Sequence, residues 1–271
     1  MGLGIFVNTS DGFQDCWPPF FELFRLYGGS LCSHPVYLNT ERAEYVGTHT
    51  SIYSTKAWAE TETTRPSWSQ RLLRGLDSVQ EDYVLFLLED YFFKCAVPES
   101  LLEDALRIVQ SDPSVGVIYL TPYGPKIRKS KFYSEFFVEI FPPADYLVST
   151  QAALWRRDYL RSLVRDWENI WMFEKFGSLR ALRSPRRMLG LSQKAIENGE
   201  FLDYVWTGVM KGKWKPECVE LFRDHGITVD FSRRGFYKEM GRVKSRMEVF
   251  QKLFGRPLPA LRSILSLLPG S

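Results

Sequence analysis

An unbroken apolar run in the first third of the chain ends in two carboxylates. Residues 83–88 read Tyr-Val-Leu-Phe-Leu-Leu, and Glu89 and Asp90 follow directly. An apolar run of this length, bounded by polar residues, predicts a strand that is buried on both faces of a parallel sheet. Because ligands of open α/β sheets bind beyond the carboxyl ends of the strands, both carboxylates are expected where substrate meets the sheet.

The chemistry of this acidic pair suggests a metal–nucleotide site. Carboxylate oxygens suit Mg²⁺ or Mn²⁺ that bridges to phosphates. Neighbouring strand residues point to opposite faces, so Glu89 and Asp90 can reach one ligand only where the strand has already ended. An acidic pair after a strand can equally cap the next helix or lie in a solvated turn.

Periodicity elsewhere predicts alternating strands and helices. We expect strands at residues 4–7, 35–39 and 115–120, a short one near 44–46, and helices at residues 17–27, 68–79 and 98–110. This β-α-β-α-β-α-β order predicts a parallel sheet with helices on both faces. Later in the chain, residues 132–141 alternate as an antiparallel strand does, and residues 151–164 suit a strand end that feeds a helix.

The last segment differs in charge from the rest. Residues 236–268 have a helical, amphipathic pattern that is interrupted at residues 255–259. Around it stand nine basic residues against Glu239 and Glu248, namely Arg233, Arg234, Lys238, Arg242, Lys244, Arg246, Lys252, Arg256 and Arg262. Such a segment can lie on an anionic membrane, or its apolar stripe can pack on the domain or on a second subunit. We therefore expect a main domain at residues 1–234 and a separate basic helical segment at 235–271.

Composition excludes several classes of protein. With 271 residues, 45% of them hydrophobic, the chain suits one large domain or one domain with an appendage. A net charge of +3 argues against nucleic-acid binding. The four cysteines lack C-x-x-C spacing and the three histidines form no ligand motif, which argues against zinc and against a disulfide framework. We expect a cytoplasmic protein without a signal peptide or a transmembrane segment.

Several motifs, taken in order, resemble those of GT-A glycosyltransferases, and more closely bacterial enzymes of surface-polysaccharide assembly. The matching pieces lie between Ile5 and Arg234, at residues 68–72, 83–91, 153–160, 171–174 and 208–214. The resemblance implies an α/β, Rossmann-like GT-A fold with a mostly parallel central sheet and flanking helices. It also implies a transferase that moves a sugar from a nucleotide sugar to a hydroxyl of a glycan or a lipid-linked acceptor.

The resemblance carries a set of donor-binding residues with it. In GT-A enzymes an Asp-x-Asp motif after a central strand holds a divalent cation against the donor diphosphate, and here that position reads Glu89-Asp90 without the intervening residue. Asp90 is the implied metal ligand, for Mg²⁺ or Mn²⁺. The other implied donor contacts follow the first two strands or lie in the helix before the acidic pair: Asn8, Thr9, Asp11, Asn39 and Arg71. Arg71 can instead be a surface arginine beside Arg74.

Glu174 is the implied catalytic base, because many inverting GT-A enzymes place an acidic residue at this point of the chain. An inverting transfer needs a carboxylate that takes the proton of the acceptor hydroxyl. The aromatic residues around Glu174 could raise its pKa by desolvation. Glu174 can also be a helix cap or pair with Lys175 or Arg180. Other carboxylates compete for the role, with Asp166 and Glu168 as rivals and Asp145 and Asp203 expected to be structural.

Aromatic residues and alternative functions stay open at this point. Trp155, Trp171, Trp206 and Trp214 could stack on sugars, although most large aromatic residues belong to a core. A sugar nucleotidyltransferase is a weaker alternative, since the loop at residues 8–12 has one glycine and no lysine to hold a triphosphate. The unusual acidic pair also leaves room for a non-catalytic, transferase-like subunit that binds glycan or recruits a partner at the membrane.

Overall fold

The computed structural model describes residues 2–47, 51–142, 144–239, 250–255 and 257–267. These residues form one nine-stranded sheet with the order β3-β2-β1-β4-β8-β5-β9-β7-β6. The strands are β1 (Leu3–Asn8), β2 (Val36–Asn39), β3 (Ile52–Ser54), β4 (Tyr83–Leu88), β5 (Val115–Tyr119), β6 (Lys129–Phe132), β7 (Phe137–Phe141), β8 (Ala153–Arg156) and β9 (Arg187–Leu191). Seven of the nine run in one direction, and only β8 and β7 oppose them. The predicted mostly parallel sheet is confirmed.

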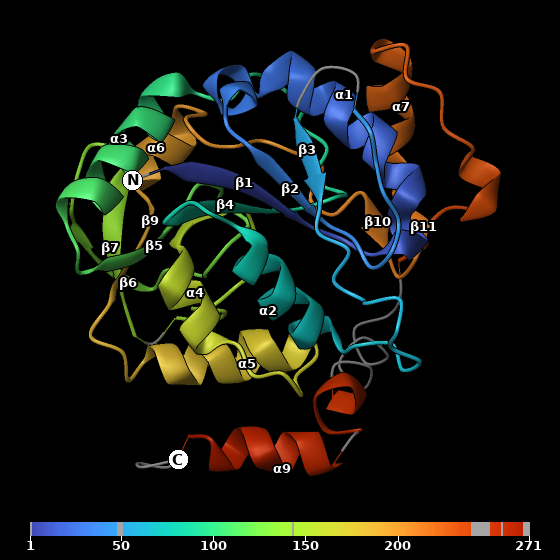
Figure 1. Cartoon of the computed structure of the whole chain (residues 1–271). Coiled ribbons are helices and arrows are strands. Elements are labelled where there is room, and N and C mark those ends of the chain that lie inside the picture. Colours follow the sequence, from blue (N-terminus) through green and yellow to red (C-terminus); the bar gives the residue numbers. More distant parts are fainter. Residues whose placement is uncertain (1, 48–50, 143, 240–249, 256, 268–271) are drawn as a thin grey trace.

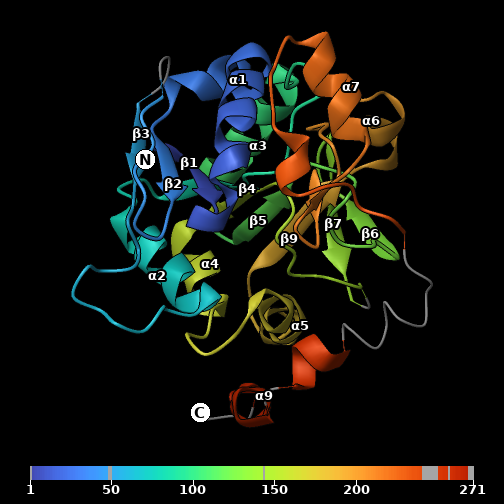
Figure 2. The ribbon, with the colours of Figure 1, turned by 90° about the vertical axis from the view of Figure 1, so that its right-hand side faces the viewer.

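Helices cover both faces of this sheet (Figures 1 and 2). They are α1 (Trp17–Tyr27), α2 (Trp68–Ser78), α3 (Glu99–Ser111), α4 (Arg157–Leu163), α5 (Ile170–Ala181), α6 (Gln193–Glu197), α7 (Glu217–Asp224) and α9 (Pro257–Leu265). Short 3-10 turns lie at Asp11–Cys16, Gly29–Ser33 and Phe231–Arg233, and β10 (Val209–Met210) pairs with β11 (Lys213–Trp214) as a separate hairpin. In Figure 2, α1 and α3 lie on one side of the sheet, and α2, α4 and α5 lie on the other.

The central strand β4 shows why its sequence is apolar throughout. Tyr83, Leu85 and Leu87 belong to the core under α1 and α3. Val84 and Phe86 belong to the second core, under α2, α4 and α5. Since adjacent residues of a strand face opposite sides, both faces need apolar side chains. The run therefore ends where the strand leaves the two cores, at the acidic pair.

The second half departs from the predicted pattern in its strands. The strand expected at 151–164 is β8, but it lies antiparallel between β4 and β5 and separates two strands that the pattern left adjacent. The alternating segment at 132–141 is two strands, β6 and β7, which pair as a hairpin. Residues 44–46 form no strand, and the neighbour of β2 is instead β3. The strand β9 lies beside β5 and was not expected.

The described part of the basic tail packs on α5 and on the loop before it. Ala260 of α9 is buried against Met172 and Phe176 of α5, and Trp167 Nε1 donates a hydrogen bond to Ser263 Oγ (2.9 Å). Figure 1 shows α9 running below α5. The expected helix is seen at residues 250–254 and in α9, while 240–249 lie outside the described residues. Among the helices that the structure describes, none has the length and apolar character needed to cross a bilayer.

Candidate functional site

The carboxyl edge of the sheet brings the ends of β1, β2 and β4 together. Asn8 is the last residue of β1 and pairs in register with Asn39 of β2 on one side and with Leu88 of β4 on the other. Polar residues that follow these strands are therefore neighbours in space. The antiparallel β8 begins at the same edge, so the residues just before it join the group as well.

The acidic pair is buried at the centre of this edge. Asp90 is 4% exposed and Glu89 is 7% exposed. Asp90 Oδ2 accepts hydrogen bonds from the Val209 amide (3.1 Å) and from the Thr207 hydroxyl (3.2 Å). The Thr9 hydroxyl, to which Trp17 Nε1 donates (2.9 Å), hydrogen-bonds the Glu89 carboxylate. The strand has ended, so both carboxyl groups stay at the edge of the sheet.

These carboxylates are incompletely neutralised. Burial raises the pKa of Asp90 to about 6. Burial, with the charge of Asp90 as the second cause, raises the pKa of Glu89 well above its usual range. The cation that acts on both is Arg234, but its Nε donates to Asp15 Oδ2 (2.6 Å). Arg234 is shared by two adjacent buried carboxylates and also pairs with Asp15. Binding of a further positive charge at this site is therefore favoured.

The residues present fit a divalent cation that is held jointly with a phosphate ligand. Among the described residues no cluster of three or more His, Cys, Asp or Glu could hold a metal alone. The hydrogen bonds from Thr207 and Val209 to the Asp90 carboxylate both end on Oδ2. Mg²⁺ usually binds through one or two carboxylates together with substrate phosphates. Asp90 and Glu89 match that arrangement.

Asn8 and Asn39 form a buried amide pair. Asn39 Nδ2 donates to Asn8 Oδ1 (2.7 Å) and to the Arg71 carbonyl (3.3 Å), and the Thr55 hydroxyl donates to Asn39 Oδ1 (2.8 Å). Gly75 of α2 is needed here, because a Cβ at that position would lie 2.2 Å from Asn39 Oδ1. The pair ties the ends of β1 and β2 to α2, so at least part of its role is structural.

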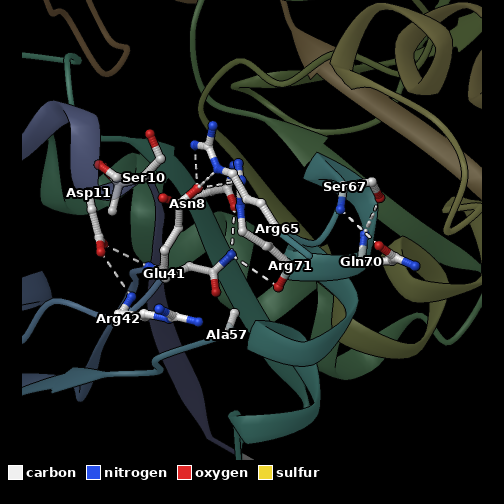
Figure 3. A network of polar contacts seen from close by, with 12 residues as sticks. Asn8, Ser10, Asp11, Glu41, Arg42, Ala57, Arg65, Ser67, Gln70 and Arg71 are labelled. Carbon is white, nitrogen blue, oxygen red and sulfur yellow. Dashed lines mark hydrogen bonds and ion pairs between the residues drawn. The ribbon is translucent and has the colours of Figure 1, made fainter. Parts of the chain in front are cut away.

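Asp11 and Arg71 organise the segment after β2 (Figure 3). The Asp11 carboxylate accepts from three consecutive amides, those of Glu41 (2.8 Å), Arg42 (2.9 Å) and Ala43 (3.0 Å). The guanidinium of Arg71 forms an ion pair with Glu41, and Arg65 Nε donates to the same carboxylate (2.8 Å). We call Asp11, Glu41, Arg65 and Arg71 the arginine network.

The surface alternative for Arg71 is wrong. Arg71 is 8% exposed, whereas the side chain of Arg74 is 40% exposed and pairs with Glu62 (2.6 Å). Glu41 is the residue that sequence reasoning missed. It lies in a polar segment without periodicity, and its only signal is its position two residues after the second strand.

Glu174 joins the same edge from α5. Its Oε1 accepts both the amide and the hydroxyl of Thr150, each at 2.9 Å. The hydroxyl of Tyr91, the residue after the acidic pair, donates to the Thr150 carbonyl (3.1 Å). Thr150 thus connects Glu174 to the acidic pair. Burial raises the pKa of Glu174 above its usual range, against the two hydrogen bonds from Thr150.

The alternatives to Glu174 have other partners or positions. Arg180 pairs with Glu168 (2.6 Å), and both are buried, so the proposed Glu174–Arg180 pair is not formed. Asp166 is exposed in the loop before α5. Asp145 pairs with Arg128 (2.7 Å), and Asp203 pairs with Lys94 (2.8 Å) and accepts from Tyr123 (3.1 Å). Of these five carboxylates, Glu174 is the one that the structure links to Thr150.

The four tryptophans fall into two classes. Trp155 and Trp214 are buried in the cores, whereas Trp171 is 37% exposed and Trp206 is 49% exposed. Trp206 stacks on Tyr123 with ring centroids 6.2 Å apart. It precedes Thr207, the residue that bonds Asp90 and that adopts a left-handed backbone conformation (φ 47°). Strain of this kind in a non-glycine residue clusters at functional sites. Only Trp171 and Trp206 are open to a ligand.

Comparison with known proteins gives matches in structure. No protein-family model matches the sequence, and the search of curated proteins finds no match. TarS 1-349 from S. aureus matches with a TM-score of 0.51 and 14% identity over 99% of this chain and 81% of that one. Mannosyl-3-phosphoglycerate synthase from Rubrobacter xylanophilus matches with a TM-score of 0.43 and 9% identity over 86% of this chain and 78% of that one.

A third match is glucosyl-3-phosphoglycerate synthase from Mycobacterium tuberculosis in complex with Mn²⁺, uridine diphosphate and phosphoglyceric acid. Its TM-score is 0.41 at 9% identity, over 69% of this chain and 66% of that one. The chain spans less than two thirds of the length of several matched structures. At such identities the likeness to TarS establishes the fold and leaves the substrate open. The chain has the GT-A fold of the glycosyltransferases that its sequence resembles.

Proposed function

We propose that this protein is a glycosyltransferase that moves a sugar from a nucleotide sugar to an acceptor hydroxyl. The acidic pair carries the proposal, because two buried, incompletely neutralised carboxylates lie at the carboxyl edge of a GT-A sheet. A structural pair at this position would have its own countercharge. A nucleoside diphosphate with a divalent cation supplies what the pair lacks.

Asp90 and Glu89 would hold Mg²⁺ or Mn²⁺ together with the donor diphosphate. The ion neutralises charge on the leaving nucleoside diphosphate. Asn8, Thr9, Asp11, Asn39 and Arg71 are proposed to shape the donor side. The proposal is supported by the hydrogen bonds that join Asn39 to Asn8 and to the Arg71 carbonyl, and by the three amides of the segment at 41–43 that Asp11 fixes.

Glu174 is proposed as the base of an inverting transfer. The acceptor oxygen attacks the anomeric carbon while the bond from that carbon to the diphosphate oxygen breaks. The acceptor proton passes to Glu174, and the nucleoside diphosphate leaves with the bonding electrons. Thr150 holds Oε1 with two hydrogen bonds, so Oε2 is the oxygen left for the proton. A raised pKa suits a base that works near neutral pH.

Purified protein tests this proposal in two measurements. Melting temperature is recorded with UDP, GDP and dTDP, each with and without Mn²⁺, because a ligand of the folded state raises it by mass action. Slow hydrolysis of the matching nucleotide sugars is then assayed. Stabilisation that needs both nucleotide and Mn²⁺, together with hydrolysis, supports the enzyme. Stabilisation without any hydrolysis or transfer favours the non-catalytic, glycan-binding alternative.

We further propose a peripheral position at the cytoplasmic face of a membrane. The outer face of α9 carries Leu258 (74% exposed), Leu261 and Leu265, and Arg262 lies beside them over the Trp167 ring (4.2 Å). Basic and apolar groups on one exposed face favour anionic lipid. Co-sedimentation with phosphatidylglycerol vesicles at low salt tests this, with Leu261→Asp expected to weaken binding. A dimer in solution that dissociates in Leu261→Asp would assign the face to a second subunit instead.

A further inference from the structure

An apolar cavity of about 700 Å³ opens beside Glu174. Its walls come from α5, from the segment that follows β7 and from the tail, with Leu147, Leu179, Leu182 and Leu253 among the lining side chains. The volume lies within the range of small-molecule sites in proteins. The cavity is therefore large enough for a ligand beside the proposed base.

One face of α5 runs along the cavity. Trp171, Glu174, Ser178 and Leu182 follow one another at helical spacing and all line it. Ser178 Oγ is already used, since it accepts from the Val148 amide (2.9 Å) and donates to the Glu174 carbonyl (2.5 Å). Beyond Glu174 this face thus offers mainly apolar surface.

The remaining polar side chains of the lining are those of Asp145, Tyr146 and Lys175, and all three are exposed. Asp145 is paired with Arg128 (2.7 Å). Lys175 is an exposed cation next to Glu174, and Lys252 Nζ lies 3.9 Å from the centroid of the Trp171 ring. A purely polar ligand in this cavity would lose hydrogen bonds to water and regain few. A hydrocarbon chain has no hydrogen bonds to water to lose, and the burial of its apolar surface is favourable.

One turn of the tail borders the cavity and carries exposed apolar side chains. Leu253 lines the cavity, and its neighbours on the same helical turn, Phe250 and Phe254, are 65% and 39% exposed. Asn169 Nδ2 donates to the Lys252 carbonyl (2.8 Å), which fixes this turn against the start of α5. Phe250 and Phe254 thus add exposed apolar surface next to the part of the cavity that Leu253 lines.

We propose that this cavity binds the hydrocarbon chain of an amphiphilic acceptor whose phosphorylated head lies toward Glu174. Lys175, in the lining beside Glu174, provides positive charge for an acceptor phosphate. The hydroxyl that receives the sugar then belongs to the head group, within reach of the proposed base. The inference names the acceptor class of the site proposed above and rests on that proposed function.

Alkyl phosphates of eight, ten and twelve carbons, used below their micellar concentrations, test the cavity directly. Calorimetry with the full chain measures their affinities. Each buried methylene raises affinity by up to about fourfold. We expect dodecyl phosphate to bind at least about tenfold more tightly than octyl phosphate.

Two cavity-filling variants and one matched control test whether the alkyl chain binds in this cavity. Leu179→Trp and Ala144→Trp place a large ring in the cavity, and each should remove most of the chain-length dependence. Leu261→Trp makes the same leucine-to-tryptophan change on the exposed face of α9 and should keep it. Melting curves and UDP–Mn²⁺ binding confirm that each variant is folded with an intact donor side.

The outcomes separate this inference from the proposed function. Equal affinity for all three chain lengths, or an unchanged dependence in both cavity variants, overturns the acceptor site even if UDP and Mn²⁺ bind. If the dependence on alkyl chain length is lost in Leu261→Trp alone, the alkyl chain binds on the surface of the tail, and the proposed acceptor site is wrong. Chain-length dependence confined to the cavity, without any nucleotide binding, would support the hydrocarbon site and refute the transferase.

Discussion

Two groups of buried charge lie at the same edge of the sheet, and they are neutralised differently. In the arginine network, Glu41 is paired with Arg71 and with Arg65, and Asp11 has three amide donors. In the acidic pair, Asp90 has one amide and one hydroxyl donor, and the nearby Arg234 is committed to Asp15. Glu41 and Arg71 are 5% and 8% exposed, which is close to the values of Glu89 and Asp90, whereas Arg65 lies at the surface.

The difference supports a structural role for the arginine network and the proposed ligand-binding role for the acidic pair. Buried charge is tolerated where partners compensate for lost hydration. The arginine network has those partners within the chain. Among the described residues the acidic pair forms no ion pair, and burial raises the pKa values of both carboxyl groups although Arg234 acts against it. Substitutions in the two groups should therefore differ in what they damage.

The largest expected effect is the loss of activity in Asp90→Asn. Without this carboxylate the site cannot hold a cation against the donor diphosphate, which is worth several kcal/mol, or about a thousandfold in turnover or more. Hydrolysis of the nucleotide sugar and Mn²⁺-dependent stabilisation by the nucleotide are measured together. Asp77→Asn, at an exposed aspartate paired with Arg161, is the matched control. Normal turnover in Asp90→Asn would remove the acidic pair from the site.

The arginine network should instead fail in stability. Glu41→Gln leaves the buried guanidinium of Arg71 without its charge partner, and such a loss costs about 3 to 5 kcal/mol. Chemical denaturation measures the free energy of unfolding. Glu62→Gln breaks the Arg74 pair, whose side chains are 40% and 37% exposed, and should cost less than about 1 kcal/mol. Equal losses in the two variants would mean that the network is not a buried, structural group.

Glu174→Gln tests whether a third carboxylate behaves like the acidic pair. We expect turnover to fall about a hundredfold, because general base catalysis is lost, with donor affinity nearly unchanged. In the unmodified protein, activity should fall as pH drops through the raised pKa of Glu174, since protonation removes the base. The fall of activity at low pH should be absent from the pH profile of Glu174→Gln. A parallel fall of donor affinity and rate would place Glu174 on the donor side instead.

The sequence was most informative where one segment alone determines its own environment. The run at 83–88 predicted β4 with its bounds, because a strand buried on both faces needs apolar residues throughout. The helix at Trp17–Tyr27 was likewise predicted to the residue, with proline in its first turn. The end of β4 then fixed the place of the acidic pair.

The sequence was least informative where distant segments combine. The insertion of β8 between β4 and β5 depends on pairing across some seventy residues, which local periodicity does not contain. The donors to Asp90, Thr207 and Val209, come from a loop more than a hundred residues later. Thr150 likewise fixes Glu174 from outside its helix. Which distant strand pairs with which, and which distant donor bonds a given carboxylate, is decided by tertiary packing.

The smallest expected effect is a gain of stability in Asp90→Asn, opposite in sign to the loss expected for Glu41→Gln. The folded-state pKa of Asp90, about 6, lies above its ordinary value of 3.8, so between these values the folded state binds more protons than the unfolded state. Stability conferred by the protonated form is complete below about pH 4 and is lost as pH rises through about 6. At pH 7, without metal, Asp90→Asn should therefore stabilise the protein by about 3 kcal/mol. Asparagine keeps an oxygen that can accept from Val209 and Thr207.

Denaturation curves in EDTA at pH 4 and pH 7 measure the change, which should nearly vanish at pH 4. A destabilised Asp90→Asn at pH 7 would show that the pair is structurally compensated, as the arginine network is.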